Sequence, residues 1–183
     1  MLRTTTTILG ALTITLGALC APTLADEPKK ECCVEGTPHA AQLGRLVDLV
    51  GEWASADEDG DGKADVTVSY RLTGGGSALV ETLMPGTPQE MVSVYHRDHD
   101  AWVLAHYCAA GNQPRMRGAP VAVSKAAFEI AFTFADATNV DPKVGRMQAM
   151  RLTLVDATRL RHEWTFAGPE GEQTHAFELT RRS

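Results

Sequence analysis

Apolar and polar residues alternate with a period of two along most of the chain. Val66, Val68 and Tyr70, for example, are separated from one another by single polar residues. This alternation is typical of strands with one buried face, and the stretches rich in Gly, Pro, Asp and Asn between them indicate turns. The segments that we predict to be strands are 66–71, 78–84, 91–96, 102–108, 127–134, 147–155, 160–167 and 174–181.

The order of these segments favours an all-β fold. No helical segment separates consecutive strands, so a parallel sheet with crossover helices is not expected. Strands joined by short hairpin loops predict an up-and-down antiparallel β-barrel of about 8–9 strands, because closure of the sheet removes its edges. A sandwich of two sheets is the alternative. We interpret residues 109–120, which are rich in Gly, Pro, Asn and Arg, as a long loop.

One segment, 39–50, has the period of a helix instead. Its apolar residues Leu43, Leu46 and Leu49 recur at helical spacing, and Gly51 follows as a stop. We therefore expect one short amphipathic N-terminal helix before the barrel, and a barrel domain that spans residues 39–183.

The first 25 residues have the pattern of a secretory signal peptide. Arg3 supplies the positive charge, residues 8–19 are apolar, and small residues precede the predicted cleavage after Ala25. The apolar run is too short to cross a membrane, and no other segment is long enough. Cys20 offers lipoprotein anchoring as an alternative, but Leu19 before it is larger than such sites prefer. We expect a secreted or periplasmic protein without a transmembrane span, with a flexible leader over residues 26–38.

Three cysteines remain after the predicted cleavage: Cys32, Cys33 and Cys108. In an oxidising compartment, one member of the vicinal pair can bridge to Cys108, or the vicinal pair can bond to itself. An odd number leaves one thiol without an intramolecular partner. The sequence leaves the pairing open.

The net charge and the absence of known motifs limit the classes of function that we expect. The formal net charge is −6, whereas a general nucleic-acid binder carries a basic excess, so we expect no nucleic-acid partner. The chain contains no Gly-x-Ser-x-Gly elbow, His-Glu-x-x-His motif, P-loop or dinucleotide-binding glycine motif. These absences weigh against an enzyme.

The arrangement of the domain resembles the lipocalin, or calycin, plan. A short helix is followed by Gly51-Glu52-Trp53, by meandering strands, and by Arg181 or Arg182 at the end of the last strand. The resemblance implies that Trp53 is buried and that the late arginine packs across its indole. The run of residues 95–117 also resembles secreted bacterial proteins of unknown function with a lipocalin-like barrel, and that likeness implies no activity.

The predicted strand 102–108 carries the first candidate site. Residues two apart share a face of a strand, so Trp102, Leu104, His106 and Cys108 point the same way. If the apolar pair lies inside the barrel, His106 and Cys108 lie there too. They are candidate contacts for an organic ligand, or ligands for a metal or haem, with His96 as a further metal ligand. A histidine that is simply packed in the core is the alternative.

The segment after this strand carries the second candidate site. Asn112, Arg115 and Arg117 are long polar residues close together in sequence. At a barrel mouth they would hold the carboxylate or phosphate end of an amphipathic ligand, because arginine binds such groups with two hydrogen bonds. The alternative is a structural loop.

An acidic segment carries the third candidate site. Asp57, Asp59, Asp61 and Asp65 match positions 1, 3, 5 and 9 of an EF-hand calcium loop. Position 12, which should be a bidentate glutamate, is Val68. The segment is a weak calcium-loop candidate, and a solvated acidic turn is the alternative.

Taken together, these features favour a barrel that binds a small apolar or amphipathic molecule without catalysis. Three alternatives stay open at this point. They are a metal- or haem-binding barrel that uses His106, an enzyme with an active site inside the barrel, and a structural or interaction module whose barrel is filled.

Overall fold

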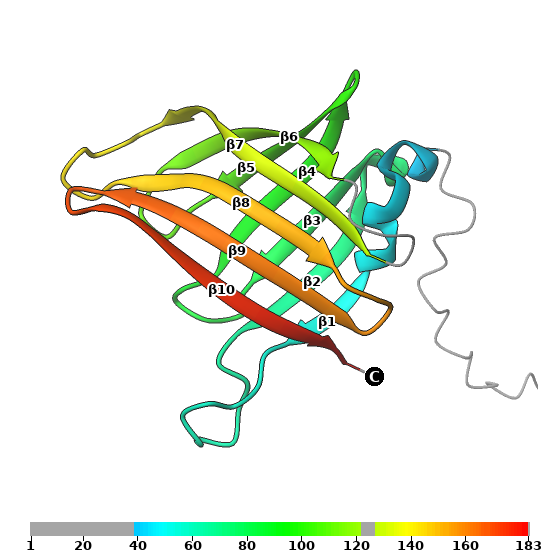
Figure 1. The fold of residues 1–183 in the computed structure, drawn as a ribbon, viewed down its shortest axis with the longest axis horizontal. Coiled ribbons are helices and arrows are strands. Elements are labelled where there is room, and N and C mark those ends of the chain that lie inside the picture. Colours follow the sequence, from blue (N-terminus) through cyan, green and yellow to red (C-terminus); the bar gives the residue numbers. More distant parts are fainter. Residues whose placement is uncertain (1–38, 122–126, 183) are drawn as a thin grey trace, which may run out of the picture. The chain divides into compact units, whose positions relative to one another are not determined.

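The computed structural model describes residues 39–121 and 127–182, and these form a closed antiparallel barrel of ten strands (Figure 1). The predicted signal peptide and leader, together with Cys20, Cys32 and Cys33, lie outside the described residues. No helix in the described part of the chain is long and apolar enough to cross a membrane. The elements are η1 (Ala40–Leu49), β1 (Gly51–Ala54), β2 (Thr67–Thr73), η2 (Gly74–Gly76), β3 (Ala78–Leu83), β4 (Met91–Asp98), β5 (Ala101–Tyr107), β6 (Gln113–Val121), β7 (Phe128–Thr138), β8 (Arg146–Leu154), β9 (Arg159–Gly168) and β10 (Gly171–Arg181).

Each strand from β2 onward pairs with the next strand in sequence, and β10 returns to β1 to close the barrel. The closing pair is short, since Trp53 stands opposite Arg181 and Ala54 opposite Thr180. This is the up-and-down order that the hairpin pattern predicts, and it leaves no sheet edge unpaired.

The expected number of 8–9 strands was wrong, because two strands were not predicted: residues 51–54 form β1, and residues 113–121, most of which lie in the predicted loop, form β6. Inward and outward positions alternate along β6: Met116 is buried and Gly118 stands opposite Phe132, whereas Arg115 and Arg117 point outward. Gly118 is required by close packing, since a Cβ atom there would lie 2.7 Å from the carbonyl oxygen of Ala131.

The predicted short N-terminal helix is present as a 3-10 helix. Its buried residues are Ala40, Leu43, Leu46 and Leu49, which recur every three residues. The segment is kinked at Gly44 (φ 51°, ψ −132°), so it consists of two short 3-10 stretches, and its buried leucines join the core of the barrel. Helix η1 packs against β2, β3 and β4, and Figure 1 shows it covering one end of the barrel.

The junction of β1, β10 and η1, which we call the seam, is built around Trp53. Its side chain is fully buried, and its Nε1 donates a hydrogen bond to the carbonyl oxygen of Leu49 over 2.8 Å. The guanidinium carbon of Arg181 lies 4.2 Å from the centre of the indole ring. Gly51 has a φ of 128°, and a Cβ atom there would come within 3.0 Å of the Arg181 guanidinium. This geometry is the one that the Gly-x-Trp resemblance implied for Trp53 and Arg181.

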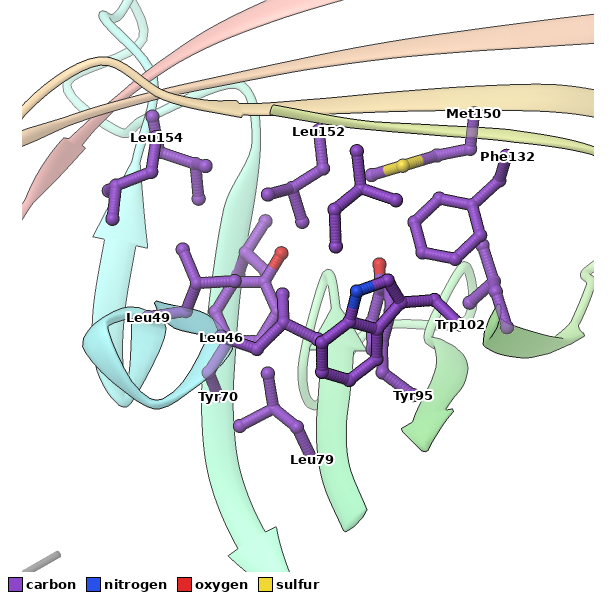
Figure 2. Packing of buried hydrophobic residues seen from close by; sticks show 14 of the residues in the cluster. Leu46, Leu49, Tyr70, Leu79, Tyr95, Trp102, Phe132, Met150, Leu152 and Leu154 are labelled. Atoms are coloured by element: carbon purple, nitrogen blue, oxygen red, sulfur yellow. The ribbon is translucent and has the colours of Figure 1, made fainter. Parts of the chain in front are cut away.

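Apolar side chains fill the interior on the side that η1 covers. Figure 2 shows residues of η1 and of the barrel strands pointing into one cluster. The labelled members of this cluster are Leu46, Leu49, Tyr70, Leu79, Tyr95, Trp102, Phe132, Met150, Leu152 and Leu154.

Candidate functional site

A row of polar side chains crosses the inner wall of the barrel. Tyr70 of β2 stands opposite Glu81 of β3, Glu81 opposite Ser93 of β4, and Ser93 opposite His106 of β5. Each is at most 3% exposed. Because directly opposite residues on neighbouring strands project from the same face, the pairing alone brings these four groups side by side.

Glu81 is the acceptor at the centre of this row. The hydroxyl of Tyr70 donates to its Oε1 over 2.7 Å, and the hydroxyl of Tyr95 donates to its Oε2 over 2.9 Å. Ser93 stands opposite Glu81 on the neighbouring strand, and its hydroxyl group lowers the pKa of the same carboxyl group. Burial raises the pKa of Glu81, and the three hydroxyl groups oppose that rise because they stabilise the ionised form.

His162 of β9 reaches the row from across the barrel. Its Nε2 lies 2.8 Å from the Tyr70 hydroxyl oxygen, and its Nδ1 lies 3.6 Å from Oε1 of Glu81. Burial lowers the pKa of His162 to about 3. The ring is therefore neutral near pH 7, and it joins β9 to β2 through a hydrogen bond rather than through charge.

His106 ends the row. Its Nδ1 lies 2.9 Å from Ser93 Oγ, and its ring centre lies 4.7 Å from that of Trp164 on β9. The other ring nitrogen, Nε2, is buried without a hydrogen-bond partner. Burial lowers the pKa of His106 to about 4, so the ring is neutral at pH 7. The result is a neutral imidazole with one nitrogen free to meet another molecule.

A cavity of about 310 Å³ lies beside His106, away from η1. The strand ends that face it are those of β3, β4, β5 and β8, together with parts of β9 and β10. Gln89 and His175 are exposed and form its rim. The full lining is Val66, Leu83, Met84, Gln89, Met91, His106, Met147, Trp164, His175 and Phe177. The interior is thus neither wholly filled nor wholly open.

Cys108 does not line this cavity. It follows β5 as a half-buried free thiol, the single free cysteine in the described ranges. Burial raises its pKa, so the thiol is protonated at pH 7. The structure also places His96 away from His106, because His96 lies on the opposite face of its strand from Ser93 and Tyr95. Cys108, His96 and His106 therefore do not lie together in one site.

The structure does not bring Arg115 and Arg117 to the cavity either. Both project from the outer face of β6, where Arg115 pairs with Asp136 at 2.6 Å and Arg117 with Asp98 at 2.8 Å. Asn112 is fully buried, and its Nδ2 donates to the carbonyl oxygen of Gly145 over 2.8 Å. Asn112 joins two loops, and the arginines complete ion pairs on the surface.

The acidic segment forms an exposed loop between β1 and β2. Carboxylate oxygens of Asp57, Asp59 and Asp61 lie within 4.8 Å of one another, the one group of this kind among residues 39–121 and 127–182. Asp65 instead accepts a hydrogen bond from the Glu58 amide. Val68 at the twelfth position is buried in the barrel. Calcium binding here stays a prediction from the sequence.

Sequence reasoning missed Glu81, Ser93 and Trp164. A signal was present, because Glu81 stands two residues from both Leu79 and Leu83, and such spacing puts a polar residue on the buried face. The meeting of His106 with Trp164 had no signal, since it depends on which strands face each other across the barrel.

No protein-family model matches this chain, and no curated protein matches it. Among solved structures, the crystal structure of Rv2717c from M. tuberculosis is similar, with a TM-score of 0.56 and 15% sequence identity. The match covers 79% of this chain and 98% of that one. At this identity the likeness concerns the fold, a closed antiparallel barrel.

Proposed function

We propose that this protein is an exported, lipocalin-like barrel that binds a small apolar molecule in the cavity beside His106. The observation that carries the proposal is the cavity itself, a hollow of about 310 Å³ walled mainly by methionine, leucine and aromatic side chains. Ligand sites of soluble proteins are of this kind, with a mostly apolar wall and a few polar groups that orient the ligand.

The volume limits the size of the ligand. Ligand cavities span roughly 300–1,000 Å³, and this one is at the small end of that range. Met84, Met91 and Met147 contribute flexible, polarisable side chains to the wall, and such residues adapt to ligands of different shape. A molecule about the size of a two-ring aromatic hydrocarbon fits these limits.

The charges around the cavity favour a neutral ligand. Among the described residues that line it, none is acidic and none is a lysine or arginine. His106 is neutral at pH 7 because burial lowers its pKa to about 4. A charged ligand would lose its hydration without gaining a counter-charge, which is costly.

Naphthalene binding, measured by isothermal titration calorimetry, tests the proposal. Val66→Phe adds bulk to the cavity wall and should abolish or strongly weaken binding. Val121→Phe adds the same bulk at an exposed position on β6 and should leave binding unchanged. Absence of binding by the native protein would overturn the proposal, and equal binding by both variants would move the ligand to another site.

Export is part of the same proposal and has its own test. The charged start, short apolar core and small residues before Ala25 support cleavage there. N-terminal sequencing of the exported protein should give Asp26 as the first residue. An acylated Cys20 would replace release with membrane anchoring.

A second candidate uses the same atom of His106. An unpartnered imidazole nitrogen that faces a cavity also suits a metal centre or the iron of a haem, although a haem is larger than this cavity of about 310 Å³ and would have to displace part of its wall. Titration with haemin, followed by absorbance, separates the two candidates. A shifted Soret band in the native protein that is lost in His106→Phe would favour haem over the apolar ligand.

A further inference from the structure

With Glu81 ionised, the hydrogen atoms of the polar row can be assigned to donors and acceptors. Tyr70, Tyr95 and Ser93 each carry a single hydroxyl proton. Tyr70 and Tyr95 donate to the Glu81 carboxyl group, and Ser93 stands directly opposite it and lowers its pKa, as a donor does. A carboxylate has four lone pairs and no proton, so it accepts all three. Each hydroxyl proton is then used.

The direction of the Ser93 hydrogen bond determines which nitrogen of His106 carries the proton. A serine that donates its proton to Glu81 has only lone pairs left for its other neighbour, so it accepts a hydrogen bond from His106 Nδ1 over 2.9 Å. A neutral imidazole carries one N–H group. With the proton on Nδ1, the nitrogen that faces the cavity, Nε2, carries a lone pair.

We propose that Glu81 and Ser93 hold His106 in its Nδ1–H tautomer, and that the cavity therefore selects a small apolar molecule bearing a neutral hydroxyl group, which donates its proton to His106 Nε2. The choice of ligand class rests on the proposed function, whereas the tautomer does not. Glu81 and Ser93 are positioning residues here, since His106 alone meets the ligand.

Two further observations favour a hydroxyl over other donors. No described residue of the lining is acidic, so an ammonium donor would lie there without a counter-charge. The Nε1 of Trp164, whose ring lies against His106, is a buried donor without a partner. A hydroxyl oxygen can accept from an indole N–H while its proton goes to an imidazole, which an N–H donor such as an aniline does less well.

Three probes of similar shape test the ligand class: 2-naphthol, which donates and accepts, 2-methoxynaphthalene, which only accepts, and naphthalene, which does neither. Calorimetry should show 2-naphthol binding about 3- to 10-fold more tightly than 2-methoxynaphthalene, the ratio expected for one neutral hydrogen bond. In His106→Phe this ratio should fall to about one, with naphthalene still bound.

The Glu81→Gln variant is the sharper test, because it should reverse the preference for 2-naphthol over 2-methoxynaphthalene. Tyr70 and Tyr95 donate to different oxygens of Glu81, and a glutamine keeps only one of these acceptors. With its oxygen toward Tyr95, its NH2 group faces Tyr70 and donates to Ser93, and Tyr70 turns its own proton to His162 Nε2. Ser93 then donates to His106 Nδ1, and the proton of the imidazole moves to Nε2. This variant should bind 2-methoxynaphthalene at least as tightly as 2-naphthol. Ser93→Ala removes the link and should abolish the preference without reversing it.

Nitrogen-15 NMR of the histidine rings reads the tautomer directly, without any ligand. We expect the Nδ1–H form for His106 in the native protein and the Nε2–H form in Glu81→Gln. A native Nε2–H form would overturn the inference, since it would mean that Glu81 is protonated and donates to Ser93. Equal binding of all three probes would overturn the ligand class alone, and no binding of any probe would overturn the proposed function with it.

Discussion

Two buried tryptophans show how differently the seam and the cavity are built. At the seam, Trp53 donates its indole proton to the Leu49 carbonyl oxygen, and Arg181 covers its ring. Beside the cavity, Trp164 is as deeply buried, but its indole N–H has no partner, and neither has Nε2 of the neighbouring His106. Unpaired buried polar atoms cost stability, and these two lie on the wall of a cavity that another molecule can enter.

Acidification should give the largest effect, because the buried histidines among the described residues lie in the cavity region and not at the seam. The pKa values of His106 and His162 are lowered to about 4 and about 3 in the folded protein, against 6.5 for an ordinary histidine. At a pH between the folded and the unfolded pKa of each histidine, the unfolded chain binds a proton that the folded chain does not. Stability is therefore fully present above pH 6.5 and is lost as the pH falls toward 4, by roughly 3 kcal/mol for each histidine. The raised pKa of Glu81 acts in the opposite direction and offsets part of the loss.

Urea unfolding at several pH values measures this effect. His106→Phe should flatten the pH dependence, because one of the two buried imidazoles is gone. Trp53→Phe should leave the dependence unchanged, because no titrating histidine contacts the seam in the described structure. An unchanged slope in His106→Phe would contradict the assignment of acid sensitivity to the cavity region.

Trp53→Ala should be the most damaging single substitution at the seam. It removes a fully buried indole, its hydrogen bond to Leu49 and the surface on which Arg181 packs. Deletion of a large aromatic side chain from a core costs about 3–5 kcal/mol. Chemical denaturation checks the value, and Trp53→Phe, which keeps most of the volume, serves as the control. A loss below about 1 kcal/mol would mean that the seam contributes little to stability.

Arg181→Lys should have a smaller effect, of about 1–3 kcal/mol. The guanidinium donates to the carbonyl oxygens of Asp48, Val50 and Ala157, which lie on η1, after η1 and between β8 and β9. A lysine keeps the charge but cannot reach three carbonyl groups in this planar arrangement. Arg182→Lys, at an exposed position, is the matched control and should leave the midpoint of denaturation unchanged.

Trp164→Phe should have the smallest effect on stability, below about 1 kcal/mol, because the indole N–H that it removes has no partner to lose. Its effect should be on binding, with a lower affinity for a hydroxyl-bearing probe and an unchanged affinity for naphthalene. Comparison of the two Trp→Phe variants isolates the hydrogen bond of Trp53. Equal destabilisation by both would remove the distinction between the two regions.

The alternation of apolar and polar residues in the sequence predicted most of the strands. Strands with clear period-two patterns, such as β2 and β7, were found, and the pattern around Trp53 indicated how it packs. β6 was missed because its inward positions include Pro114 and Gly118, which are the residues expected in a loop. The sequence predicted the short N-terminal helix but not its type, because a spacing of three satisfies both a 3-10 helix and, over a short segment, an α-helix.

The site was harder to predict, for a physical reason. The position of His106 on an inward face follows from its strand alone, but the outward direction of Arg115 and Arg117 depends on β6 being a strand at all. The contact between Tyr70 and His162 joins residues 92 positions apart. Such contacts depend on how a barrel brings non-neighbouring strands face to face, which periodicity along one strand does not encode.

The short pairing of β1 with β10 also affects the order in which the barrel folds. Trp53 meets its strand partner at Arg181 in β10, and Arg181 bonds to carbonyl groups more than 130 positions earlier. A chain that emerges from the ribosome or a translocation pore cannot close this barrel until β10 has emerged. Because so distant a pairing must bear the entropy of a long loop, closure comes late, after the consecutive hairpins from β2 to β10 have formed. Until then Trp53 has no strand beside it on one side, and the open edges of β1 and β10 are accessible to proteases and chaperones.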